Sequence, residues 1–329
     1  MKGFLALIMA LGVALLHADE PALLTLKSTI ALPGVEGRFD HAAADVATHR
    51  LFFAALGNNT LEVVDVAAGK RLHTITGLKK PTGVLFLAGE NLLVVANGDD
   101  GTCRFYDGKS YAERGRVTGV DDADNLRFDA KAKRIWLGYG EGALGVIDPV
   151  AMKLTASIPL AKHPESFQLE QDGPRIFVNV PDAKQIAVVD RVAGKVVETW
   201  PLQDVRANFP MALDENRHRL FVGCRQPARL LAFDTQSGRR VEETTMSGDI
   251  DDLFFDAASS RLLASCGEGF VDIFRFTAPA ELAHSHRLPS AAGARTAFFS
   301  AELRMFCLAV PHRGAQGAEI RIYTLAAAQ

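Results

Sequence analysis

The stretch RLFFAALGNNTLEVVD, residues 50–65, decides the fold because its pattern returns along the whole chain. It contains a short apolar run, a polar turn at residues 57–59, and a second apolar run that closes on Asp65. Two strand-like runs joined by Gly and Asn are typical of a β-hairpin. The stretch therefore predicts two antiparallel strands.

The first half of this hairpin occurs seven times in the 329-residue chain, at intervals of 41 to 44 residues. The copies are RLFFAA (50–55), NLLVVA (91–96), RIWLGY (134–139), RIFVNV (175–180), RLFVGC (219–224), RLLASC (261–266) and RMFCLA (304–309). Two more strand-like segments fill each interval, as in VVETW (196–200) and NFPMALD (208–214). Four short strands at this period are typical of propeller blades. The sequence predicts an all-β fold, a seven-bladed β-propeller with four-stranded antiparallel blades, as a single domain over residues 19–329.

The seventh copy has room for only three strands before Gln329. The segment LTLKSTIAL (24–32), near the other end of the chain, has the character of an outermost strand. We predict that this N-terminal strand completes the last blade and closes the ring, which would hide sheet edges that otherwise invite pairing.

Residues 1–18 have the pattern of an export signal: Lys2, an apolar run over 4–16, and Ala18 at a cleavage position before Asp19. The apolar run is shorter than the about 20 residues that a membrane-spanning helix needs. We predict a signal peptide over residues 1–18 and a periplasmic or secreted, monomeric mature protein that does not contact the membrane after cleavage.

Composition and cysteine positions narrow the classes of partner. A net charge of −3 provides no basic field, so nucleic acid is not an expected partner. Four cysteines outside the cytoplasm would suggest disulfides. However, Cys224, Cys266 and Cys307 fall at same-parity positions of equivalent strands in successive copies, so their side chains point the same way. We predict buried, unpaired thiols.

The first copy also carries a resemblance to a known family. RLFFAALGNNTLEVVD (50–65), the turn at Gly69 and Lys70, and KPTGV (80–84) resemble the YVTN-repeat β-propellers, also called YncE-like. The resemblance covers essentially the whole mature chain and implies a seven-bladed fold and a place outside the cytoplasm. Members of that family differ in activity, so it implies little about function.

One end of the predicted channel collects polar side chains. The first strands of the copies align on the residue that ends each, from Asp45 to Ser300, and four of the seven residues five positions earlier are acids. These ring positions are Asp40, Thr82, Asp124, Glu165, Phe209, Asp251 and Arg295. Loops at this end also vary most between copies, which favours a binding surface. With neighbours added, the predicted binding residues are Asp40, His41, Thr82, Asp124, Asn125, His163, Glu165, Asn208, Asp251, Asp252, Arg295 and His312.

Several chemistries suit this ring. Carboxylates with Asn suit Ca²⁺, and a histidine among them suits Zn²⁺, so His41, Asp124, Glu165 and Asp251 are candidate metal ligands. A cationic organic ligand would suit the same charges. The alternative is structural, because Asp and Asn at strand starts also cap turns and Arg295 can pair with a neighbouring acid.

Two functional hypotheses follow. The first is a propeller that binds a small ligand or divalent metal ion at the channel mouth and presents it to a partner such as a periplasmic protein. The second is a metal-assisted hydrolase, lactonase or lyase that uses the ring for acid–base chemistry and Arg295 for an oxyanion. Covalent haem is excluded by the absence of Cys-x-x-Cys-His, and pyrroloquinoline quinone is not expected without an adjacent cysteine pair. No Gly-x-Ser-x-Gly motif occurs, so no catalytic residue is assigned.

Overall fold

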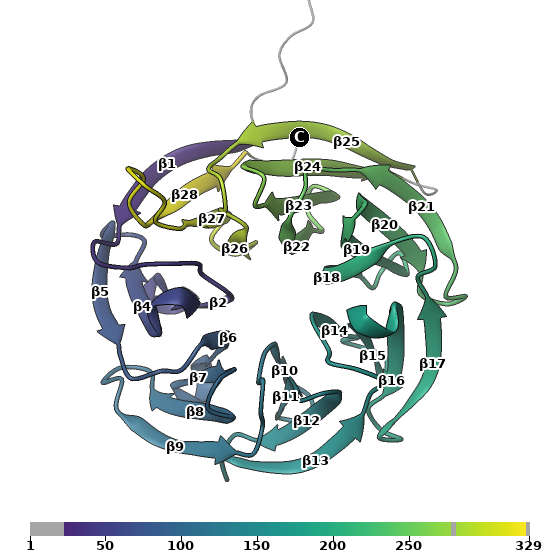
Figure 1. Cartoon of the computed structure of the whole chain (residues 1–329), viewed down its shortest axis with the longest axis horizontal. Helices are drawn as coiled ribbons and strands as arrows, with labels where there is room; N and C mark the ends of the chain where they lie inside the picture. Colours follow the sequence, from purple (N-terminus) through teal and green to yellow (C-terminus); the bar gives the residue numbers. More distant parts are fainter. Residues whose placement is uncertain (1–22, 278–280, 327–329) are drawn as a thin grey trace, which may run out of the picture.

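Seven four-stranded antiparallel sheets surround a central axis in a computed structural model of the chain (Figure 1). The structure describes residues 23–277 and 281–326. The predicted signal peptide lies outside these ranges. No helix within them is long and apolar enough to cross a membrane.

Blades one to three each use four consecutive strands, ordered from the axis outward. Their bounds are β2 (Ala42–Asp45), β3 (Arg50–Ala55), β4 (Thr60–Asp65) and β5 (Lys70–Ile75); β6 (Pro81–Leu87), β7 (Leu92–Asn97), β8 (Thr102–Asp107) and β9 (Glu113–Thr118); β10 (Leu126–Asp129), β11 (Arg134–Tyr139), β12 (Ala143–Asp148) and β13 (Lys153–Pro159).

Blades four to six repeat this arrangement. Their bounds are β14 (Phe167–Leu169), β15 (Arg175–Val180), β16 (Gln185–Asp190) and β17 (Lys195–Pro201); β18 (Arg206–Asp214), β19 (Arg219–Gln226), β20 (Ala228–Asp234) and β21 (Arg240–Thr245); β22 (Ile250–Asp256), β23 (Arg261–Cys266), β24 (Phe270–Thr277) and β25 (Glu281–Pro289). Four short 3₁₀ turns, η1 (Val46–Thr48), η2 (Leu56–Asn58), η3 (Ala88–Glu90) and η4 (Pro181–Ala183), connect strands within blades one, two and four.

Blade seven joins the two ends of the described chain. Its inner strands are β26 (Thr296–Ser300), β27 (Met305–Val310) and β28 (Glu319–Leu325), and its outermost strand is β1 (Leu24–Ala31). β1 pairs antiparallel with β28, with Leu24 opposite Leu325 and Ala31 opposite Glu319. The predicted seven-bladed fold and its closure by the N-terminal strand are confirmed.

The core lies between the blades. Buried apolar side chains of the described residues form seven clusters, and each cluster joins two neighbouring sheets. The alternation of side chains along a strand explains this, because the middle strands turn one face to each neighbouring blade. All four cysteines are buried in these layers and unpaired, as predicted.

Candidate metal centre

The same backbone hydrogen bonds place the ring residues of blades one, three and four. Just before the innermost strand, the ring residue donates its N–H to a carbonyl of the second strand: Asp40 to Ala54 at 2.8 Å, Asp124 to Gly138 at 2.9 Å, and Glu165 to Asn179 at 2.9 Å. The residue that follows each accepts a hydrogen bond of 3.0 Å from the same partner. These paired bonds fix the three carboxyl groups at the same height in the channel.

A close contact between blades two and three positions Asp124. A Cβ atom on Gly83 would lie 2.0 Å from the carbonyl oxygen of Asp124, so only glycine allows this approach. The hydroxyl of Thr82 donates to the carbonyl of Ala123 at 2.7 Å and holds the same loop. Blade two therefore contributes support to the site.

A cavity of about 290 Å³ opens at this end of the channel. Six of the seven ring positions line it, with Arg295 as the exception. Its acidic and histidine lining consists of Asp40, His41, Asp122, Asp124, His163, Glu165 and Asp251. Residues separated by up to about two hundred positions in the chain thus face one space.

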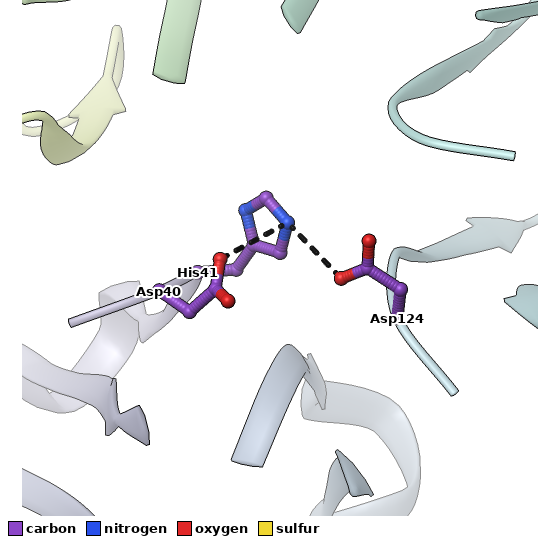
Figure 2. A group of neighbouring side chains, drawn as sticks. All are labelled: Asp40, His41 and Asp124. Carbon is purple, nitrogen blue, oxygen red and sulfur yellow. Dashed lines mark ion pairs between the residues drawn. The ribbon is translucent and has the colours of Figure 1, made fainter. Parts of the chain in front are cut away.

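Two histidines from different blades face the carboxylate of Asp124. His41 Nε2 lies 3.7 Å from Asp124 Oδ1 and 3.7 Å from Asp40 Oδ1 (Figure 2). His163 Nε2 lies 4.0 Å from the other oxygen of Asp124, Oδ2. The two ring nitrogens therefore approach opposite oxygens of one carboxylate.

An oxygen atom faces the far nitrogen of each histidine, at hydrogen-bond distance only for His163. His163 Nδ1 lies 2.6 Å from the carbonyl oxygen of Gly140, to which it donates. His41 Nδ1 lies 3.8 Å from Asp252 Oδ1. Metal-bound histidines typically donate their second N–H to a carbonyl or carboxylate, which orients the ring and leaves the first nitrogen for the metal. His163 has this arrangement, whereas Asp252 faces His41 Nδ1 from beyond hydrogen-bond distance and Asn125 Nδ2 lies 2.9 Å from His41 Nε2.

Potential ligand atoms fall into two overlapping groups in the part of the chain that the structure describes. One consists of Asp40, His41 and Asp124, and the other of Asp124, His163 and Glu165. Within each group the ligand atoms lie within 4.8 Å of one another. Asp124 belongs to both groups and is the centre of the cluster.

Burial and mutual charge shift the ionisation of this cluster strongly. Burial, reinforced by Asp124 and Asp251, raises the pKa of Asp40 to about 7, although His41 opposes the shift. Burial and the neighbouring acids also raise the pKa of Glu165 well above its usual range. These carboxyl groups hold protons at a pH where exposed acids have lost them.

The pKa values of the two histidines are also raised, which favours their charged form. Burial alone would lower the pKa of His41, but Asp252, Asp40 and Asp124 outweigh it and raise the pKa to about 10. Asp124 and the Gly140 carbonyl likewise raise the pKa of His163 to about 9 against the effect of burial. Despite its burial, the pKa of Asp124 is lowered by His163 and His41. Protons on the two histidines and on the buried acids thus offset the negative charge of the cluster. A bound cation would replace these protons.

Asp251 lines the same cavity, but arginines engage its carboxylate. Arg225 hydrogen-bonds one oxygen, and Arg295 Nε lies 3.2 Å from the other. Arg295 Nη1 also bonds Asp249 at 2.7 and 2.9 Å. The structure therefore gives both Asp251 and Arg295 ion-pair partners and leaves Asp251 outside the two ligand groups.

The remaining predicted residues lie outside the two ligand groups. Asn125 is buried, with Nδ2 placed 2.9 Å from His41 Nε2 and Oδ1 without a hydrogen-bond partner. Asp252 accepts the Ala297 N–H at 2.7 Å. Asn208 is fully buried and donates to Asn179 between blades four and five, and His312 pairs with Glu36 at 2.8 Å. Asn208 and His312 do not line the cavity.

Several lining residues are absent from the sequence prediction. They are Arg38, Lys80, Asp122 and Arg225. Arg38, Lys80 and Asp122 lie two positions before ring positions, where the repeat shows no shared residue type. Arg225 comes from the second strand, and its place in a variable hairpin was its only signal.

Comparisons with known proteins give the fold and no family. No protein-family model matches the chain, and no curated protein matches it. A chain from a crystal structure of a mitotic checkpoint complex is similar with a TM-score of 0.77 and 14% identity, over 98% of this chain and 99% of that one. A chain of hydrazine synthase from Kuenenia stuttgartiensis is similar with a TM-score of 0.77 and 14% identity, over 91% of this chain and 99% of that one. At this identity the likeness shows the architecture alone, and the chain is a seven-bladed β-propeller.

Proposed function

We propose that the protein binds a divalent metal ion at the channel mouth, with Asp124 as the central ligand and Asp40, His41, His163 and Glu165 around it. One observation carries this proposal: His41 and His163, from different blades, both present Nε2 to Asp124 while a separate acceptor faces each Nδ1. For His163 this is the outer support that metal-bound histidines use, and for His41 Asp252 supplies a carboxylate on the same side of the ring.

The donor set favours a borderline first-row ion over Ca²⁺. Calcium takes oxygen ligands almost exclusively, whereas imidazole nitrogens together with carboxylates suit Zn²⁺ and its neighbours. The close carboxyl groups of Asp40, Asp124 and Glu165 also favour a cation. Without one, the raised pKa values of Asp40 and Glu165 mean that protons offset part of their charge. Zn²⁺ is the ion that we expect to bind.

We propose that the protein binds this metal ion outside the cytoplasm and that it is a propeller of the YVTN-repeat type. The export pattern of residues 1–18 and the repeat RLFFAALGNNTLEVVD support this assignment. A propeller that carries an ion at one open mouth is suited to presenting it to a small molecule or a periplasmic protein.

Metal analysis of the purified protein tests the proposal. Wild-type protein dialysed against Zn²⁺ should retain it stoichiometrically by mass spectrometry of the metal. Asp124→Ala should lose it, and His163→Ala should bind at least tenfold more weakly. His312→Ala and Asp172→Ala are matched controls, because they remove a histidine and an exposed acid outside the cluster. A wild-type protein that retains no divalent ion, or an Asp124→Ala variant that retains as much, would contradict the proposal.

A second candidate function is that of a metal-assisted hydrolase, lactonase or lyase. The cavity of about 290 Å³ opens directly onto the ligand cluster, so a small molecule could reach a free coordination position. Assays on lactones and esters with the zinc-loaded protein should then show turnover that chelation and Asp124→Ala both abolish. Stoichiometric zinc without turnover of any substrate would leave the binding function alone.

A further inference from the structure

A second cavity of about 230 Å³ lies next to the metal-site cavity. His41, Ser166 and Asp251 line both, so the two spaces adjoin. The second cavity differs in character, because much of its wall is apolar. The apolar wall consists of Ala42, Val84, Leu126, Pro210, Met211, Leu253, Phe254, Ala297 and Phe298.

Arg127, on β10, places a guanidinium in this apolar wall. Its Nη1 donates to the carbonyl of Leu126 at 2.8 Å, and its Nη2 reaches Ser166 Oγ at 3.5 Å. No carboxylate oxygen of the described residues lies within 4.0 Å of the Arg127 guanidinium, the distance that defines an ion pair. The guanidinium carbon lies 5.6 Å from the ring centre of Phe167. Arg127 is therefore a part-buried cation that makes no ion pair with a described carboxylate, and the effect of burial, which lowers its pKa, exceeds the opposing effect of the more distant Asp252 and Asp124.

The acids near Arg127 are already engaged. Asp251 lies between Arg225 and Arg295. Asp252 accepts the Ala297 N–H and faces His41. An anion that enters the cavity would therefore find the Arg127 guanidinium without an ion-pair partner. Burial lowers the pKa of Arg127, and the charge of a bound anion would offset this cost of burial.

The repeat shows that Arg127 is not part of the blade framework. The equivalent residues of the other blades are Ala43, Leu85, Gln168, Ala212, Phe254 and Phe298. None is charged, although all occupy the same position of an innermost strand. A propeller blade therefore does not need a cation at this position.

We infer that this cavity binds a small organic acid with an apolar body, whose carboxylate pairs with Arg127 and the Ser166 hydroxyl. A guanidinium presents N–H groups that match a carboxylate in a bidentate pair. The apolar wall around it, including Met211, Leu253 and Phe298, would receive the hydrocarbon part of the ligand. The mixed lining thus selects against small inorganic anions, which would leave the wall uncovered.

Calorimetry with benzoate as the probe tests this inference, and benzamide is the neutral control of the same shape. Both are titrated into wild-type protein freed of metal with a chelator. Benzoate should bind at least tenfold more tightly than benzamide. Arg127→Gln should reduce benzoate binding at least tenfold with little effect on benzamide, and Arg127→Lys should keep part of it. Arg239→Gln removes an exposed arginine and should change nothing.

The outcomes separate this inference from the metal proposal. Equal binding of benzoate and benzamide by wild-type protein would overturn it without any variant. Benzoate binding that requires zinc and persists in Arg127→Gln would also overturn it, and would place the carboxylate on the metal. Zinc retention by Arg127→Gln is expected to match wild type, since Arg127 touches none of the proposed ligands.

Discussion

Protons and charges inside the channel mouth couple protein stability to pH. In the metal-free protein the pKa of Asp40 is raised to about 7, and those of His41 and His163 are raised to about 10 and about 9. In the unfolded chain Asp and His titrate near 3.8 and 6.5. Between pH 3.8 and about pH 10, these groups therefore hold more protons in the folded protein than in the unfolded chain.

The free energy of unfolding should consequently fall as pH rises. A first decrease is expected as Asp40 ionises up to about pH 7. The stabilisation from the two histidines is fully present below their unfolded pKa and is lost as pH rises through about 9 to 10. Urea denaturation in the presence of a chelator, repeated across this range, measures the effect. Asp124→Asn should shift the histidine phase to lower pH, and a flat profile for wild type would contradict the prediction.

Burial controls the chemistry of the four cysteines. Desolvation raises the pKa of Cys103 and of Cys224 to about 12, and raises those of Cys266 and Cys307 further. Since the thiolate is the reactive form, a thiol reagent should label none of them in the native protein at neutral pH. All four should react after denaturation, as read from the absorbance of the released chromophore. Fast labelling of the native protein would show that a blade interface opens.

At the residue scale, the repeat predicts part of the site. Aligning the first strands brings Asp40, Asp124 and Glu165 to one height, because equivalent positions of a ring face one axis. The structural alternative, in which Arg295 pairs with a neighbouring acid, is confirmed at Asp251, whereas the contact of Arg225 with the same carboxylate was not predicted because it depends on side-chain direction. Arg127 did have a signal, as the single charge at its position in seven copies.

Closure of the ring depends on the packing of β1. Ile30 is only 2% exposed and packs in the cluster between blades seven and one, whereas Leu26 on the same strand is 51% exposed. Ile30→Ala should destabilise the protein by about 2–5 kcal/mol, because it removes buried methyl groups and leaves a cavity. Leu26→Ala, the matched control, should change stability by less than about 0.5 kcal/mol. Chemical denaturation measures both, and similar effects of the two changes would mean that β1 does not hold the ring closed.

At the element scale, the sequence predicts strands better than turns. The apolar copies match the second strands of the blades to within two residues, for example NLLVVA (91–96) with β7, Leu92–Asn97, and RLFVGC (219–224) with β19, Arg219–Gln226. The 3₁₀ turns were not predicted. The residues that directly follow two of them, Asn59 and Asn91, adopt the left-handed conformation that asparagine tolerates.

Metal binding should tie separate blades together. The proposed ligands come from blades one, three and four, and blades five and six contribute none. Zinc should therefore slow amide hydrogen exchange in residues 38–41, 121–125 and 161–166. Residues 203–209 and 246–251, the equivalent loops of blades five and six, are internal controls and should change less. Equal slowing of all five loops, or the same slowing in Asp124→Ala, would argue against a shared ion.

At the scale of the whole molecule, the period near 42 residues and the seven copies were sufficient to predict the architecture. The two cavities were beyond the sequence, because their volumes depend on how far seven first strands stand from the axis. Gly83 illustrates the difficulty: its role appears only when the Asp124 backbone lies against it.

The pairing of β1 with β28 also sets the order in which the molecule can be completed. The ribosome makes β1 before any other strand of the propeller and makes its partner after all the others. During synthesis β1 must therefore remain without its partner while six blades form, and the last step of assembly joins the oldest and the newest parts of the chain.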